Sequence, residues 1–155
     1  MKETSNLDLM TERLESLKAA IICALSFSLV FILASIFNHS LLKDYFHNFY
    51  NLSTITRNWQ WLISTGIAGF SGFLFGITYR YIIRQDENPQ LKAGSVFAFG
   101  LVRALTQVDM GINFSLSVVP VVLLALESIL GFVVAAFTLD SAIKFGWVKP
   151  FISSR

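Results

Sequence analysis

Two residues of opposite charge lie inside apolar segments of this sequence, and they are the first candidates for a chemical role. Arg103 lies in a mainly apolar stretch, and Glu127 lies near the middle of another. A charge in hydrocarbon is costly and commonly marks a pathway, a binding site or an ion pair. At about 1.5 Å of rise per helical residue, Arg103 lies roughly 16 Å from Lys92 and Glu127 roughly 20 Å from Asp140. In antiparallel neighbours these depths agree within one turn, so we expect an Arg103–Glu127 contact near the membrane midplane.

Gln107 extends this polar site, because it follows Arg103 by four residues and shares its helical face. One interpretation is structural: a buried ion pair fixes how two helices align. The others are functional: a site for a partner, pigment or lipid, or a path for protons or another solute. A single Arg–Glu pair without further acidic residues or histidines makes a weak proton path. The pattern therefore favours the structural role.

The remaining reactive residue types form no catalytic or metal-binding pattern. His39 and His47 fall between apolar segments, whereas a bound haem or chlorophyll would need histidine at membrane depth. Cys23 is the single cysteine, so an internal disulfide and a cysteine-based metal site are excluded. Phosphate-binding glycine motifs and nucleophile elbows are absent. We therefore predict no metal site and no enzymatic activity, and the sequence leaves any cofactor undefined.

The composition places these residues in a membrane. Of 155 residues, 54% are apolar and 14% are charged, against about 25% charged in ordinary soluble domains. A short soluble chain exposes much of its surface to water and could not cover it with so few charges. The net charge of +2 is too small to indicate nucleic-acid binding. The sequence therefore predicts an integral membrane protein in contact with lipid.

Four segments are predicted to span the bilayer within one domain, residues 1–155. The spans lie at about 19–37, 59–83, 93–110 and 116–139. The third is ambiguous, since it is short and contains Arg103; a re-entrant element is the alternative. Four spans put nine of the twelve basic residues on one side, which is the positive-inside pattern with both termini cytoplasmic or stromal. Those nine are Lys2, Arg13, Lys18, Arg80, Arg84, Lys92, Lys144, Lys149 and Arg155.

Two flanking segments have the spacing of amphipathic helices. The first carries apolar residues on one face: Leu7, Met10, Leu14 and Leu17. The second, in the outer loop, does the same with Leu41, Leu42, Tyr45, Phe46, Phe49 and Tyr50. Such helices lie in the membrane interface, lead into spans or dock a partner. The predicted fold is therefore an all-α integral membrane four-helix bundle with N-terminal and outer-loop amphipathic interfacial helices.

Small residues recur on one face of the second span. Ala68, Gly72 and Gly76 follow each other at intervals of four residues. This spacing lets two helix backbones approach closely, so we predict a helix-packing face. Its partner is another span of the same chain, a second copy or a subunit of a larger complex.

The run that begins at Phe75 and ends at Asp109, FGITYRYIIRQDENPQLKAGSVFAFGLVRALTQVD, resembles multi-pass membrane proteins of cyanobacteria and plastids. The resemblance rests on three short segments, which are Tyr-Arg-Tyr, Asn-Pro and Phe-Gly-Leu-Val-Arg. The resemblance implies a thylakoid or plasma membrane and a role near photosynthetic complexes, and it carries over no catalytic residues.

Three functions follow as expectations. The leading one is a non-enzymatic accessory subunit or assembly factor of a larger membrane complex, bound to other membrane-protein subunits or to itself. The alternative is a small oligomeric transporter or channel that uses Arg103, Gln107 and Glu127. The third is an enzyme acting on lipid or quinone, for which His39, Asp44 and His47 are the only interfacial candidates.

Overall fold

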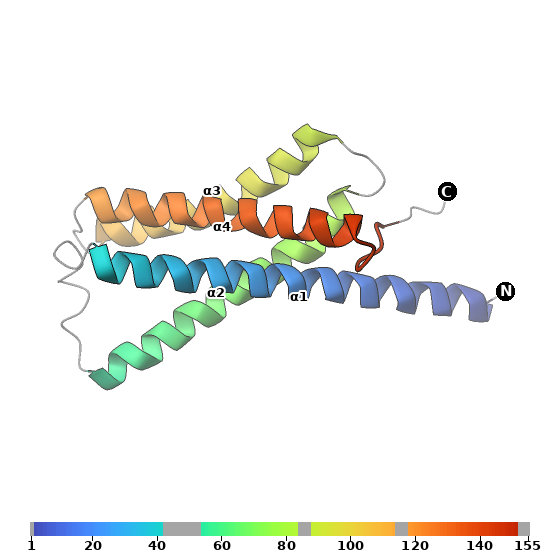
Figure 1. The fold of residues 1–155 in the computed structure, drawn as a ribbon, viewed down its shortest axis with the longest axis horizontal. Coiled ribbons are helices and arrows are strands. Elements are labelled where there is room, and N and C mark those ends of the chain that lie inside the picture. The colour runs from blue at the N-terminus through green and yellow to red at the C-terminus, as the bar shows by residue number, and fades with distance from the viewer. Residues whose placement is uncertain (1, 42–53, 84–87, 114–117, 152–155) are drawn as a thin grey trace.

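The computed structural model describes residues 2–41, 54–83, 88–113 and 118–151, which form four helices. These are α1 Lys2–Leu41, α2 Thr54–Ile83, α3 Pro89–Asn113 and α4 Val118–Lys144. The prediction of an all-helical bundle is confirmed. Figure 1 shows that successive helices run in opposite directions and that both termini lie at the same end. We call this the inner end, and the opposite end the outer end.

The N-terminal segment and the first predicted span form one uninterrupted helix of 40 residues. The N-terminal amphipathic segment therefore leads directly into the first span, which is one of the interpretations that its pattern allowed. The physical reason is local: residues 2–41 contain no glycine or proline, so nothing breaks the hydrogen-bond ladder between them. The predicted outer-loop helix lies almost wholly outside the described residues.

Three helices are long and apolar enough to cross a membrane, within the described ranges: Leu9–Asn38, Trp61–Ile83 and Val121–Lys144. The helix α3 has 25 residues, so it is about 37 Å long. Its composition is more polar, however, since it carries Lys92, Arg103 and Asp109. It packs against α4 along the bundle (Figure 1).

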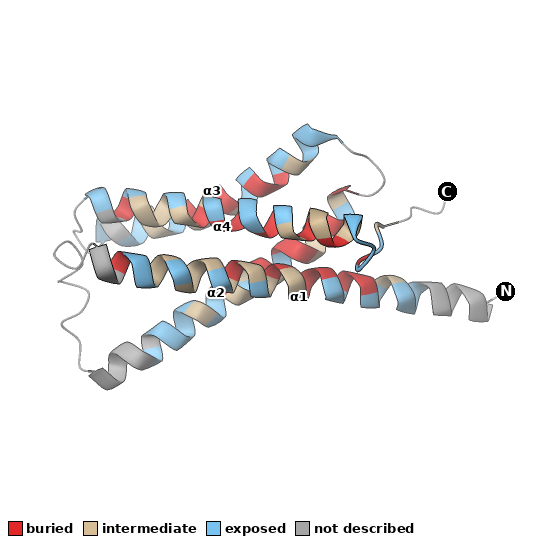
Figure 2. Ribbon diagram, in the orientation of Figure 1, coloured by how far each residue is buried: buried red, intermediate tan, exposed pale blue. Residues whose placement is uncertain are grey.

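The centre of the bundle is a cluster of four phenylalanines, one from each helix. The ring of Phe132 lies 4.5 Å from Phe27, 5.1 Å from Phe75 and 5.8 Å from Phe99, measured between ring centroids. Phe75 and Phe99 meet edge to face at 5.4 Å. Tilted and edge-to-face contacts are the favoured arrangements of aromatic rings. Figure 2 shows the buried residues gathering along the lines where the helices face one another.

The helices α1 and α2 cross in close contact at the small-residue face. A Cβ atom at Gly72 would lie 2.7 Å from the carbonyl oxygen of Cys23, and one at Gly76 would lie 2.6 Å from that of Ala19. Ala68 is fully buried on the same face. Toward the outer end α2 diverges from α1 (Figure 1), and its outer half is largely exposed (Figure 2).

The end of α4 turns the chain back onto the inner end of the bundle. Gly146 has a φ of +74°, which favours glycine. Its N–H donates to the carbonyl of Ile143, and the N–H of Trp147 donates to that of Ala142. This pair of bonds is the Schellman motif that ends many helices. Val148, just beyond, is buried against the bundle.

Candidate functional site

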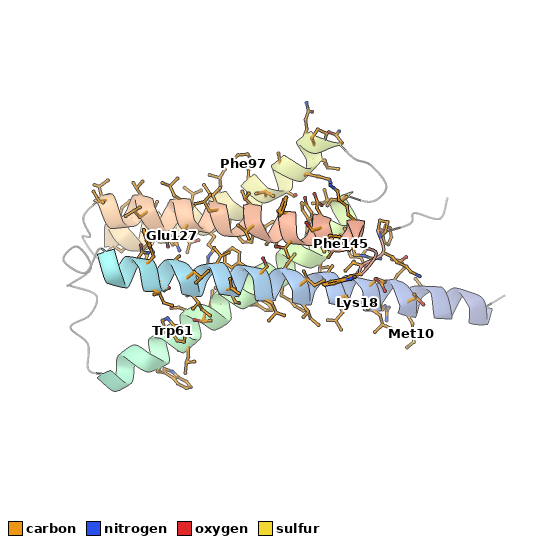
Figure 3. All side chains as sticks on the ribbon, in the orientation of Figure 1. Met10, Lys18, Trp61, Phe97, Glu127 and Phe145 are labelled. Atoms are coloured by element: carbon orange, nitrogen blue, oxygen red, sulfur yellow. The ribbon has the colours of Figure 1, made fainter. Side chains whose placement is uncertain are left out.

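Polar side chains from all four helices gather toward the outer end of the bundle, and we call them the outer polar cluster. Its members are Asn38 of α1, Ser71 of α2, Arg103 and Gln107 of α3, and Glu127 and Ser128 of α4. Asn38 lies three residues before the end of α1 at Leu41. Figure 3 likewise shows Glu127 near the outer ends of α1 and α4. The site therefore extends from the central ring of Phe27, which Arg103 contacts, toward the outer end of α1.

Arg103 and Glu127 lie at the same site but do not form the expected ion pair. The Nδ2 of Asn38 donates to Oε1 of Glu127 at 2.6 Å. The guanidinium of Arg103 donates to the hydroxyl of Ser71 at 3.1 Å and stacks over the ring of Phe27 at 5.3 Å. Arg103 thus takes its partners from α2 and α1, and Glu127 takes its partner from α1. The sequence-based estimate compared only the depths of Arg103 in α3 and Glu127 in α4. It could not show these partners, because they lie on α1 and α2.

Gln107 belongs to the same cluster. Its Oε1 accepts a hydrogen bond of 2.8 Å from the hydroxyl of Ser128. Arg103, Gln107, Glu127 and Ser128 also line one cavity of about 10 Å³, which is the space of about one water molecule. The rest of its lining is Phe27, Val30, Phe31, Ala34, Leu124 and Gly131. The site can hydrate its charges, but a solute of metabolite size does not fit.

A second group, the inner polar cluster, surrounds Arg80 and is the feature that the sequence did not reveal. Arg80 is 1% exposed. Its Nη2 forms an ion pair of 2.6 Å with Oε2 of Glu12, and its Nη1 donates to the hydroxyl of Ser16 at 2.6 Å. Its Nε donates to the carbonyl of Lys149 at 3.0 Å. One buried guanidinium therefore joins α2, α1 and the C-terminal segment.

Glu15 adds a second tie between α1 and the C-terminal segment. Its carboxylate accepts from Nζ of Lys18 at 2.7 Å and from the backbone N–H of Lys149 at 2.9 Å. A weak signal for this cluster exists in the sequence. Glu12 and Ser16 are four residues apart, on the helical face opposite the apolar residues Met10 and Leu14. That pattern locates a polar face, but it does not say that the face is turned inward.

Lys92 of α3 and Asp140 of α4 form a third ion pair, at 3.0 Å. Within the described part of the chain, there is no group of three or more histidine, cysteine or acidic residues that could hold a metal ion. His39 and His47 fall outside the residues whose side chains the structure describes.

The fold and its polar clusters define a class: a helical bundle in which three helices are apolar enough to cross a membrane. Comparisons with protein-family models, with curated proteins and with solved structures find no match to this chain.

Proposed function

We propose that this chain is a non-enzymatic membrane protein that crosses the bilayer four times and serves as a subunit or assembly factor of a larger membrane complex. The observation that carries the proposal is the divergence of α2 from the bundle. Its outer half exposes large apolar residues, among them Trp59, Trp61, Leu62, Ile63 and Ile67. A single chain thus leaves one helix with few partners over half its length, which suits a protein completed by neighbours.

The polar clusters support the same proposal. Every buried side-chain nitrogen and oxygen in the described residues has a hydrogen-bond partner. Buried polar groups whose hydrogen bonds are all made within the protein are suited to fixing how helices align. They have no free donor or acceptor to offer a ligand that comes and goes. The clusters then act as the structural ties of a scaffold.

Transport is the alternative, and the observation in its favour is the cavity beside Arg103 and Glu127. Two features weigh against it. The cavity has a volume of about 10 Å³, and the four packed phenylalanines lie between the outer and inner polar clusters. A path through one copy would have to open this aromatic layer, so transport would need a pore between copies.

The membrane that holds the complex is also part of the proposal. The resemblance of residues 75–109 favours a thylakoid or plasma membrane and a complex of the photosynthetic apparatus. The partners are then other membrane-protein subunits, or further copies of this chain, together with membrane lipid.

Native electrophoresis after gentle detergent extraction tests the proposed function. We expect the chain to migrate in a particle much larger than a monomer or dimer. Migration as a free small species in several mild detergents would reject it. Reconstitution in liposomes distinguishes the transport alternative from the proposed function. An ion flux that disappears in Glu127→Gln would favour transport instead.

A further inference from the structure

Arg103 makes few of the hydrogen bonds that its guanidinium can form. The group carries five N–H donors, and it donates one hydrogen bond, from Nη1 to the hydroxyl of Ser71. Among the ion pairs of the described residues, none includes Arg103. The rings of Phe27 and Phe31 lie 5.3 Å and 5.9 Å from its central carbon. Aromatic rings attract a cation, but they do not replace the oxygen acceptors that its N–H groups need.

The unused nitrogens of Arg103 form one accessible edge of the guanidinium. Every buried side-chain nitrogen in the described residues has a hydrogen-bond partner. Nε and Nη2 of Arg103 have none, so these two atoms are not among the buried ones. Their N–H groups point the same way, which is the geometry that binds both oxygens of a carboxylate. The cavity beside Arg103 holds about one water molecule, and water is neutral and cannot balance the charge.

The contact between Arg103 and Ser71 lies near the middle of the membrane. Along α2, Ser71 is ten residues from Trp61 and nine from Arg80, or about 15 Å and about 14 Å of helix. Trp61 is exposed toward the outer end, as is typical of tryptophan at the interface, and Arg80 belongs to the inner polar cluster. Since the hydrocarbon core is about 30 Å thick, the phosphate groups of either lipid layer lie about 15 Å away. An acceptor for Arg103 must therefore come from a group held at this depth.

Exposed apolar side chains border this contact on both helices. On α2, Ile67 and Leu74 lie one turn on either side of Ser71 and are exposed by 55% and 43%. On α3, Val102 is exposed by 68% next to Arg103. Outward of this point α2 diverges from the bundle (Figure 1). A helix that packs along this side would meet apolar residues of α2 and α3 and bring its own side chains to the guanidinium.

The acids of the described chain are engaged elsewhere. Glu127 lines the same small cavity as Arg103, but its Oε1 accepts from Asn38 of α1. Asp140 pairs with Lys92 near the inner end. A second copy would bring the same acids in the same bonds. The missing carboxylate therefore belongs to another protein.

We propose that Arg103 binds the carboxylate of an aspartate or glutamate near the middle of a transmembrane helix of another protein, which packs against α2 and α3 beside Ser71. The inference rests on the proposed function and names the chemistry of one partner contact. A charge in hydrocarbon is stabilised by an opposite charge at the same depth. A polar pair of this kind also fixes the register of the helix that carries it.

Binding of synthetic transmembrane helices tests the proposal on the full chain in nanodiscs of phosphatidylcholine. The probes are three leucine–alanine helices of about 22 residues. One has glutamate at its centre, one has glutamine there, and one has the glutamate two turns closer to an end. A dye on Lys144→Cys, in a Cys23→Ala background, and a dye on the peptide report binding by energy transfer. We expect the central-glutamate helix to bind about tenfold more tightly than the other two.

Variants of the chain separate the charge of Arg103 from the surface around it. Arg103→Gln should remove the preference for central glutamate. Arg103→Lys should retain part of it, because lysine keeps the charge but not the two-bond edge. Leu74→Ala should weaken all three peptides alike. Phe137→Ala, at an exposed position of α4, is the matched control and should change nothing.

Four results would overturn the proposal. Equal binding, or no binding, of the three helices would show that no carboxylate binds at this depth. A preference that appears only in Glu127→Gln would show that Glu127 compensates Arg103 within the chain. A preference that appears only in phosphate-free galactolipid would show that a lipid phosphate occupies the site. A preference that is lost in discs holding two copies would show that a second copy occupies it.

These outcomes are separable from the test of the proposed function. A large particle in native electrophoresis without the glutamate preference rejects only this inference. The glutamate preference without a large particle rejects only the proposed complex.

Discussion

At the scale of single residues, Arg80 is the most consequential side chain in the described bundle. It is buried and makes hydrogen bonds to α1 and to the C-terminal segment. Removing one partner of a buried ion pair leaves the other charge uncompensated, which costs more than the pair contributes. Arg80 therefore matters for the stability of the inner end, whatever the protein binds.

We expect Arg80→Gln to destabilise the bundle by about 3 kcal/mol, because Glu12 and the carbonyl of Lys149 lose their donor. The fully buried Cys23 provides the measurement, since a thiol-reactive dye reaches it only when the helices separate on heating. Arg13→Gln, at an exposed position, is the matched control and should leave the labelling temperature unchanged. Equal labelling temperatures for the two variants would contradict the assigned role.

The outer polar cluster gives a second prediction at the residue scale. Because Arg103 and Glu127 have separate partners, a double-mutant cycle of Arg103→Gln and Glu127→Gln should show a coupling below about 0.5 kcal/mol. The cycle of Asn38→Ala with Glu127→Ala should show about 1.5 kcal/mol, typical of a hydrogen bond to a charged group. Exchanging the charges, with Arg103→Glu and Glu127→Arg, should not restore stability. Recovery on exchange would mean that the two residues pair directly.

At the scale of elements, the crossing of α1 and α2 depends on two missing side chains. The backbones approach so closely at Gly72 and Gly76 that a Cβ atom would contact a carbonyl oxygen of α1 at under 3 Å. No rotamer change relieves a contact with backbone, so the helices would have to move apart.

We expect Gly72→Ala and Gly76→Ala to lower the temperature at which Cys23 becomes reactive. Overpacking costs about 1–3 kcal/mol, which exceeds the gain of up to about 1 kcal/mol from replacing glycine by alanine in a helix. Gly66→Ala on the same helix is the control, because a Cβ atom there meets nothing within 4 Å. It should leave stability unchanged or raise it slightly. A loss of stability at Gly66 similar to that at Gly72 would show that the close approach to α1 is not the cause of the loss at Gly72.

At the scale of the whole molecule, the membrane topology depends on whether α3 crosses the bilayer. If α3 crosses, Asn88 and Asn113 lie on opposite sides. In a Cys23→Ala background we expect Asn88→Cys and Lys144→Cys to be labelled by an impermeant maleimide from one side of a vesicle. Asn113→Cys should be labelled from the other side. Labelling of Asn88→Cys and Asn113→Cys from the same side would make α3 a re-entrant element.

Much of the architecture followed from the sequence, because it depends on local composition and spacing. Apolar segments of about 20 residues require helices that satisfy their own backbone in lipid, and the described residues form one helix at each of the four expected spans. The small-residue face of Ala68, Gly72 and Gly76 also followed, since residues four apart share a side of a helix. The sequence left open whether the N-terminal amphipathic segment is a separate helix, because an amphipathic pattern and an apolar span can continue within one helix.

What only the tertiary structure decided is which polar groups meet. The sequence by itself determined that Arg103 and Glu127 are charges in apolar surroundings. It did not determine their partners, because a partner depends on the rotation and crossing of four helices at once. For the same reason it assigned Arg80 to the membrane edge as one of nine bases. At that inner end the bundle buries Arg80, because Glu12, Ser16 and the returning C-terminal segment converge on it from other parts of the chain.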